Sequence, residues 1–409
     1  MINKKINKES FFYWALCLVI LTLPLPKYSL NSQSIIVLLI SWFFCNSFRD
    51  KVNNLKEMKL PFVLMSSIFW LTLIGIVYSS NTDLALDNIK KNSPFLIIPL
   101  IIFTVIKDGN VLIRFMRIFS FSVILALLFG ICKAFYFKIN NLGNFFYYTE
   151  FSRILEIHTT YFALFIVVVV IFFLLDIFKL NSHKLWLSVL SIVFLLIVLY
   201  MISSRISLIT LLIVGLLFLI SDLTIHISNR KKGLIFLTLV IVFIAFMVSP
   251  NFQNRSAGVS DFGVKTPSFS SRLLHWQGVL NTANNNNLLI GNGSGDGHIG
   301  LYEEYSKLGF DSGYRYEYNA HNQFLENILY FGLLGFISLV AIFIFSFYKS
   351  IRLKDGLIFI ITSTFFLFML LESILERHSG IILFVFLMSL CCVRIKYRLN
   401  NFKDYEIKS

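Results

Sequence analysis

Long apolar runs separated by short polar segments fill most of this 409-residue chain. A membrane-spanning helix needs roughly 20 consecutive apolar residues, within a range of about 17–25. By that measure the pattern predicts twelve spans, of which the second and the fourth are short. The predicted spans are 11–26, 34–48, 61–79, 94–106, 118–137, 160–178, 184–202, 206–221, 233–249, 325–347, 356–372 and 379–393. The sequence therefore predicts an all-α, polytopic membrane protein.

Basic residues concentrate in alternate gaps between these runs, and cytoplasmic loops are the ones enriched in Lys and Arg. Such gaps include 49–59, 107–117, 230–232 and 349–354. The bias places them, together with both termini, in the cytoplasm. Lys4, Lys5 and Lys8 precede the first run as in a signal peptide, but further spans follow, so we interpret this run as an uncleaved first span.

Composition agrees with a membrane protein. Hydrophobic residues make up 57% of the chain, charged residues only 14%, and the mean hydropathy is +0.76. The net charge of +14 resides largely in the short gaps, which argues against nucleic-acid binding. All five cysteines fall inside apolar runs and are expected to be buried hydrophobes.

The same pattern divides the chain into four parts. Residues 1–249 hold the first nine spans, 250–322 form a large periplasmic loop, 323–393 hold the last three spans, and 394–409 form a cytoplasmic tail. The loop is rich in Gly, Ser, Asn and Tyr and should contain short helices, with Ser271–Leu280 the best candidate.

Two arginines stand out at the outer membrane surface. Arg205 lies between two apolar runs. Arg272 lies four residues before Trp276, so Arg272 and Trp276 would share one helix face. A guanidinium binds phosphate oxygens bidentately, which suits a lipid-linked diphosphate. The alternatives are a charged hairpin tip for Arg205 and an interfacial helix anchored by Trp276. His275 points elsewhere on that helix, and a structural role is favoured for it.

Four further features lie near the outer ends of the spans. Gly291 and Gly293 predict a tight turn that brings backbone close to a substrate. His321 begins a membrane helix and is suited to accept a proton near neutral pH, although helix capping is the alternative. Glu326 follows it within the same segment. Glu372 and Arg377 belong to the last outer turn and either line the site or pair internally.

The sequence predicts neither a metal site nor a cofactor. It contains no Asp-x-Asp and no His-x-x-x-His, and a metal-dependent glycosyltransferase would normally present acidic pairs for a divalent ion.

Taken in order, these motifs resemble the O-antigen ligase and polymerase superfamily. The resemblance rests on the Ser-Arg start of one span, on Ser271-Arg272 with Trp276, on Gly291-x-Gly293, and on His321-Asn-x-x-Leu-Glu running into Gly332-Leu-Leu-Gly335. The predicted topology, with one large periplasmic loop after the ninth span, is similar too.

This resemblance implies a metal-independent, inverting glycosyltransferase of the bacterial inner membrane. Such an enzyme moves a glycan from undecaprenyl diphosphate to lipid A–core or to another glycan. Arg205 and Arg272 would bind the diphosphate and His321 would act as general base. Trp276, Gly291, Gly293, Glu326, Glu372 and Arg377 are candidates for lining the site.

Ligase activity is the first expectation, and a polymerase of the same superfamily is the second. A polysaccharide transporter or flippase is the alternative from another class. It is less favoured because the predicted spans hold almost no charged residues at mid-membrane, where ion-coupled transporters usually carry them.

Overall fold

The computed structural model describes residues 8–26, 28–179, 185–220, 229–248 and 268–406. Within these ranges every regular element is a helix, as predicted. The helices are α1 (Lys8–Thr22), α2 (Tyr28–Phe44), α3 (Phe48–Glu57), α4 (Lys59–Gly75), η1 (Ile76–Tyr78), α5 (Thr82–Asn92), α6 (Pro94–Val105), α7 (Val111–Ile139), α8 (Tyr148–Leu155), α9 (Thr159–Lys179), α10 (Leu185–Ile202), α11 (Arg205–Ile220), α12 (Asn229–Met247), α14 (Ser268–Asn285), α15 (Leu301–Lys307), α16 (Asp311–Arg315), α17 (Gln323–Arg352), α18 (Gly356–Leu371), η2 (Ile374–Glu376) and α19 (His378–Glu406).

Each of the twelve predicted spans falls on an apolar helix, but the count of twelve is not confirmed. Among the described residues six helices are long and apolar enough to cross a membrane, or seven if the bent pair α2 and α3 forms one span. Most of the other apolar helices are short. At 1.5 Å per residue the 12 residues of α6 extend about 18 Å, well below a hydrocarbon core of about 30 Å.

A buried core of phenylalanines joins the helices around α19. Residues 379–395 of α19 are all buried. Phe384 contacts Phe365 of α18 at a ring-centroid distance of 5.2 Å and Phe343 of α17 at 6.0 Å, while Phe386 contacts Phe115 of α7 at 5.5 Å. Edge-on contacts of this kind add to the dispersion energy of burial. Because α19 touches α6, α7, α17 and α18, it is the central element of the fold.

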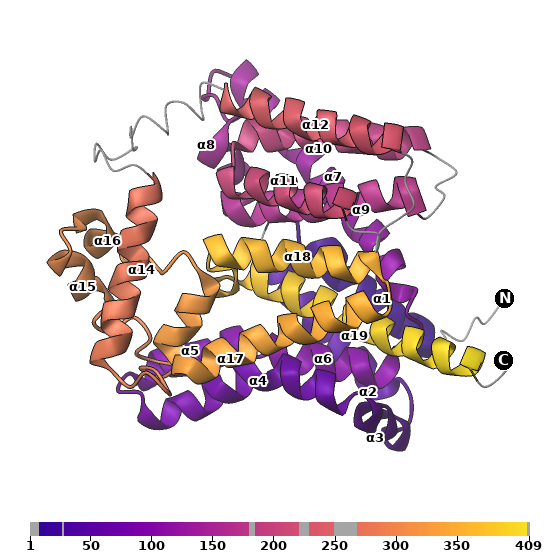
Figure 1. The fold of residues 1–409 in the computed structure, drawn as a ribbon, viewed down its shortest axis with the longest axis horizontal. Helices are drawn as coiled ribbons and strands as arrows, with labels where there is room; N and C mark the ends of the chain where they lie inside the picture. The colour runs from indigo at the N-terminus through magenta and orange to yellow at the C-terminus, as the bar shows by residue number, and fades with distance from the viewer. Residues whose placement is uncertain (1–7, 27, 180–184, 221–228, 249–267, 407–409) are drawn as a thin grey trace.

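The short helices and the end of α19 lie at opposite ends of the molecule (Figure 1). α14, α15, α16 and the beginning of α17 lie together at one end, and the end of α19 lies at the other. Helix α14 contains the predicted segment Ser271–Leu280, which confirms that prediction. The first part of the predicted loop, residues 250–267, lies outside the described residues. The side of the membrane that each end faces stays a prediction.

A buried ion-pair cluster closes the end that carries the terminus of α19. The Asp355 carboxylate accepts from Arg394 Nε at 2.7 Å and lies 3.1 Å from Arg398 Nε, and it also caps α18 by accepting the N–H of Leu357. Arg394 further donates to the Gly109 carbonyl at the start of α7. These contacts bring the turns before α7 and α18 to one end of the molecule.

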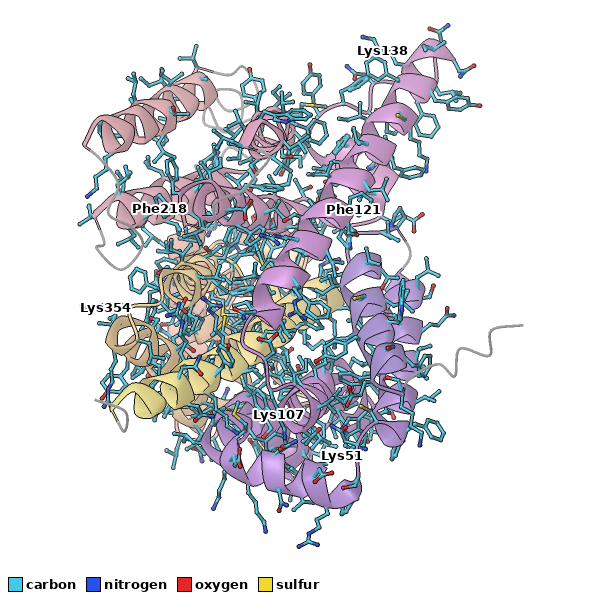
Figure 2. All side chains as sticks on the ribbon, turned by 90° about the vertical axis from the view of Figure 1, so that its right-hand side faces the viewer. Lys51, Lys107, Phe121, Lys138, Phe218 and Lys354 are labelled. Atoms are coloured by element: carbon cyan, nitrogen blue, oxygen red, sulfur yellow. The ribbon has the colours of Figure 1, made fainter. Side chains whose placement is uncertain are left out.

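Figure 2 looks onto this end and labels Lys51, Lys107 and Lys354, three basic residues that the charge pattern assigns to the cytoplasmic side. Helix α7 runs from this region past Phe121 to Lys138, which lies apart from the other labelled residues. Its outer part exposes large apolar side chains, among them Phe129 and Phe135. An apolar surface of this kind suits contact with lipid.

Replacing Asp355 with Ala should lower the free energy of unfolding by about 3 kcal/mol or more, because it leaves the Arg394 guanidinium buried without its carboxylate and removes a helix cap. Thermal unfolding in detergent measures this. The matched control is Asp87→Ala, since Asp87 pairs with Lys90 at 2.9 Å on an exposed surface, where such a pair contributes at most about 1 kcal/mol. Equal losses in the two variants would contradict the assignment of Asp355.

Candidate functional site

His321 occupies a strained turn immediately before α17. Its φ of 46° lies in the left-handed region, which a residue with a side chain adopts only at a cost of roughly 1–3 kcal/mol. Two asparagines hold the turn: Asn319 Oδ1 accepts the His321 N–H at 3.0 Å, and Asn322 Oδ1 caps α17 by accepting the N–H groups of Phe324 and Leu325. The sequence Asn-Ala-His-Asn therefore specifies the backbone that carries the imidazole.

The His321 imidazole is hydrogen-bonded to the Glu372 carboxylate, with Nδ1 and Oε1 2.8 Å apart. Burial by itself would raise the pKa of Glu372, but the charges of His321, Arg272 and His158 outweigh it and lower that pKa. The ionised carboxylate can only accept, so Nδ1 carries the proton of this bond. In the neutral ring, Nε2 is then left with a lone pair that can take a proton.

A second, fully buried carboxylate joins the two backbone segments of this pair. Glu326 Oε2 accepts the N–H of Ala320 at 2.9 Å and the hydroxyl of Ser373 at 3.2 Å. Ala320 directly precedes His321, and Ser373 directly follows Glu372. The Ser373 oxygen also accepts the N–H of Asn322 at 3.2 Å. Glu326 thereby positions the pair without touching either member.

His298 supplies the counter-charge for Glu326. Its Nε2 is hydrogen-bonded to Glu326 Oε1. Burial would lower the pKa of His298, but the Glu326 carboxylate reverses the effect and raises it. Sequence reasoning missed His298, because no local motif links it to a carboxylate 28 positions further along the chain.

Arg272 reaches the same place from α14. Its guanidinium donates to the carbonyl of Leu371, the residue that ends α18 and precedes Glu372. Burial lowers the pKa of Arg272, and Glu372 opposes that shift. Trp276 lies one turn further along α14. Its indole N–H is buried and has no hydrogen-bond partner among the residues that the structure describes.

His275 lies between these two residues and packs against His321, with ring centroids 4.9 Å apart. The structural role favoured for it fits its burial and its hydrogen bond from Nδ1 to Tyr305 Oη at 3.1 Å. Burial, assisted by the charges of His321 and Arg272, lowers the pKa of His275 to about 3. His275 is therefore neutral at physiological pH and does not add a charge beside His321. No sequence motif indicates this contact.

Arg205 and Arg377 lie on elements that adjoin the segment carrying Glu372. Arg205 is the first residue of α11, which packs against α18, the helix that leads to Glu372. Arg377 is exposed in the turn between η2 and α19, and its charge adds to burial in lowering the pKa of His158. The convergence of Arg205 with Arg272 and His321 stays a prediction.

The glycine turn packs on a break in α17. Gly291 has a φ of +71°, and a Cβ there would lie 2.5 Å from the backbone nitrogen of Gly332, whose own φ and ψ of 60° and −151° interrupt α17. Asn292 and Gly293 donate their N–H groups to the Leu329 and Tyr330 carbonyls, both at 2.9 Å. The turn therefore brings backbone close to backbone and supports the helix that begins after His321. Its contact with a substrate stays a prediction.

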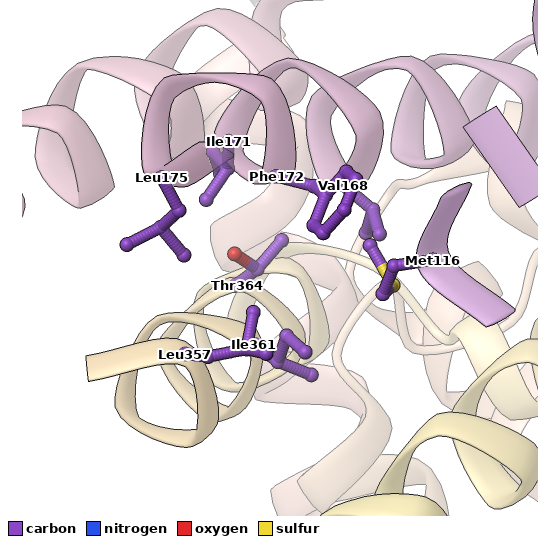
Figure 3. Close-up of a pocket in the computed structure, with 8 residues that line it drawn as sticks. All are labelled: Met116, Val168, Ile171, Phe172, Leu175, Leu357, Ile361 and Thr364. Carbon is purple, nitrogen blue, oxygen red and sulfur yellow. The ribbon is translucent and has the colours of Figure 1, made fainter. Parts of the chain in front are cut away.

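A separate small pocket lies between α7, α9 and α18 (Figure 3). Figure 3 shows side chains from these three helices pointing toward one another across it. Its lining consists of Met116, Val168, Ile171, Phe172, Leu175, Leu357, Ile361 and Thr364. The pocket thus offers one hydroxyl and no titratable group.

No group of three or more His, Cys, Asp and Glu residues within the described ranges is arranged to hold a metal ion. The side chains that gather at the site are one imidazole with a bound carboxylate, one arginine and a second, buried carboxylate.

Comparison with known families identifies one match. Residues 190–340 match the family described as O-antigen ligase, which confirms the resemblance to the O-antigen ligase superfamily. The matched segment contains Arg205, Arg272, His321 and Glu326 and ends before Glu372. No curated protein matches the chain. The family and the apolar helices together indicate a multi-pass bacterial membrane protein of glycosyltransferase type.

Gly291→Ala should destabilise the protein clearly more than Gly309→Ala. Both glycines have a φ near +70°, so each substitution carries a similar backbone cost of about 1 kcal/mol. A Cβ at Gly309 meets nothing within 4 Å, whereas one at Gly291 meets the backbone of α17 and should cost about 2 kcal/mol more. Thermal unfolding of the two variants tests this, and equal losses would show that the turn does not need its close approach to Gly332.

Proposed function

We propose that this protein is an O-antigen ligase-like enzyme that transfers a glycan from undecaprenyl diphosphate to lipid A–core, with inversion and without a metal, at the periplasmic face of the inner membrane. The observation that carries the proposal is the hydrogen bond between His321 and Glu372, with Arg272 bound to the adjoining Leu371 carbonyl. The family match to residues 190–340 supports the class of reaction.

His321 acts as the general base. With its Nδ1 proton held by Glu372, Nε2 takes the proton from the acceptor hydroxyl as the hydroxyl oxygen attacks the anomeric carbon. Glu372 holds the ring in the required tautomer and stabilises the imidazolium that forms, as a carboxylate does in hydrolytic triads. Neutral His275, packed on the ring, does not oppose this charge.

Arg272 stabilises the leaving group. The bond between the anomeric carbon and the diphosphate oxygen breaks as the new glycosidic bond forms, and the electron pair goes to the diphosphate. A half-buried guanidinium at the membrane surface interacts strongly with that charge because little water screens it. Arg205 is proposed as the second diphosphate-binding arginine. Attack from the face opposite the leaving group inverts the anomeric centre, and the activated donor supplies the energy.

A strain whose chromosomal copy carries His321→Ala should accumulate long glycan chains on the carrier lipid and none on lipid A–core, because the acceptor hydroxyl is no longer deprotonated. Lipopolysaccharide profiling reads this out. His378→Ala is the matched control, since this half-buried histidine bonds Asn31 away from the proposed chemistry, and normal glycan transfer is expected.

Single glycan repeats on the core of the His321→Ala strain would instead indicate the alternative function, a polymerase of the same superfamily. Full-length chains on lipid A–core would remove His321 from the mechanism.

Glu372→Gln should lower kcat by about 10³-fold at neutral pH, since the general base loses its charged partner, while both KM values change little. A stopped or continuous transfer assay with the purified enzyme measures this. A drop in kcat below threefold would contradict the proposed role of Glu372.

The pH dependence of the unfolding free energy of Glu372→Gln provides an independent check on the Glu372 carboxylate. The pKa of Glu372 is lowered in the folded protein, so its ionised form stabilises the fold above the unfolded-state pKa of about 4.3. That stabilisation disappears as the pH falls through the lowered pKa. The difference in unfolding free energy between wild type and Glu372→Gln should therefore be largest near neutral pH and shrink below about pH 4.

A further inference from the structure

A row of tyrosine rings leads from the surface of α16 to His321. Tyr316 follows α16 directly, is 40% exposed, and stacks on Tyr318 with ring centroids 5.9 Å apart and an interplanar angle of 25°. Tyr318 in turn lies 6.2 Å from the His321 ring and 5.7 Å from that of His275. The rings thus form a continuous path between the surface and the proposed general base.

The backbone holds these rings in place. Tyr318 N–H donates to the Gly313 carbonyl at 3.1 Å, and Tyr316 N–H donates to Ser312 at 3.0 Å. Beneath them, Tyr305 is fully buried and packs with Phe310 in a small separate core. Tyr305 and Phe310 fill that core, so its packing does not need the Tyr316 side chain. A rigid, half-exposed aromatic surface of this kind is typical of a binding site.

A second tyrosine segment approaches from α8. Tyr147 precedes α8 and is 46% exposed. Tyr148 begins that helix, and its phenol is close enough to contribute to a raised pKa of Tyr318, after burial and Tyr316.

We propose that Tyr316 and Tyr318 form a stacking platform for a pyranose ring of the acceptor glycan. A pyranose presents a face of C–H groups that packs on an aromatic ring, and its hydroxyls find hydrogen-bond partners in the surrounding phenols. Tyr318 lies 6.2 Å from the His321 ring, so this surface is on the side of the site where a hydroxyl must be deprotonated, whereas Arg272 reaches the site from α14. The inference rests on the proposed function and specifies which surface binds the acceptor.

Transfer kinetics test the platform. Tyr316→Ala should raise the KM for lipid A–core about tenfold, the fold-change expected for one aromatic contact, and leave kcat and the donor KM nearly unchanged. Tyr316→Trp should restore the acceptor KM. The matched control is Tyr348→Ala, which removes a tyrosine that is 56% exposed near the far end of α17 and should change nothing.

Three outcomes would overturn the proposal. One is an unchanged acceptor KM in Tyr316→Ala. Another is a rise in the donor KM instead. The third is an equal effect of Tyr348→Ala, which would make these tyrosines anchors at the lipid headgroups, a common position for this residue type.

A binding measurement separates failure of the platform from failure of the proposed function. Core oligosaccharide, cleaved from lipid A, is added to the full-length protein in detergent, and saturation is transferred from the aromatic protons to the sugar. The platform predicts a signal in the wild type that is lost in Tyr316→Ala and retained in His321→Ala. Binding with this pattern but without transfer would refute the enzyme and keep the platform. Normal transfer without a difference between wild type and Tyr316→Ala would refute the platform alone.

Discussion

Two buried carboxylates lie beneath the turn before α17, and each needs charged or hydrogen-bonding partners. This requirement organises the site. Glu326 is fully buried and Glu372 nearly so, and a buried carboxylate is tolerated only with charged or hydrogen-bonding partners. Their partners come from segments far apart in sequence: His298 from the glycine-rich loop, His321 from the turn before α17, and Ser373 from the turn after α18. Folding these segments together and positioning the imidazole are consequently one event.

The fold gives this arrangement a rigid base. The glycine turn at Gly291 is joined by backbone hydrogen bonds to the break in α17 at Gly332, which lies about three turns after His321. Helix α14 adds Arg272 and His275 from another direction. Since α18 leads directly from the apolar core to Glu372, the site is fixed to helices that are buried within the bundle.

Hydropathy alone predicted the helices well but not their lengths. Every predicted span coincides with a helix, because an apolar run of sufficient length has few other ways to satisfy its backbone in a membrane. The apolar run at 94–106 predicts a span, but α6 is too short to cross a bilayer unaided. Local motifs likewise singled out Arg272, His321, Glu326 and Glu372. They could not reveal that Glu326 contacts His298 or that His275 packs on His321, since those contacts arise from tertiary packing across loops. The role of Gly291 was also hidden, because its neighbour, Gly332, is 41 positions away.

In the proposed mechanism, Glu372 holds the proton of His321 on Nδ1 and leaves Nε2 free to act as a base. Nitrogen NMR of protein labelled with ¹⁵N-histidine reports this directly, with His321→Gln used to assign the signal among the seven histidines of the chain. At a pH at which the His321 ring is neutral, we expect a protonated Nδ1 and an unprotonated Nε2. A neutral ring that carries its proton on Nε2 would contradict the proposed mechanism.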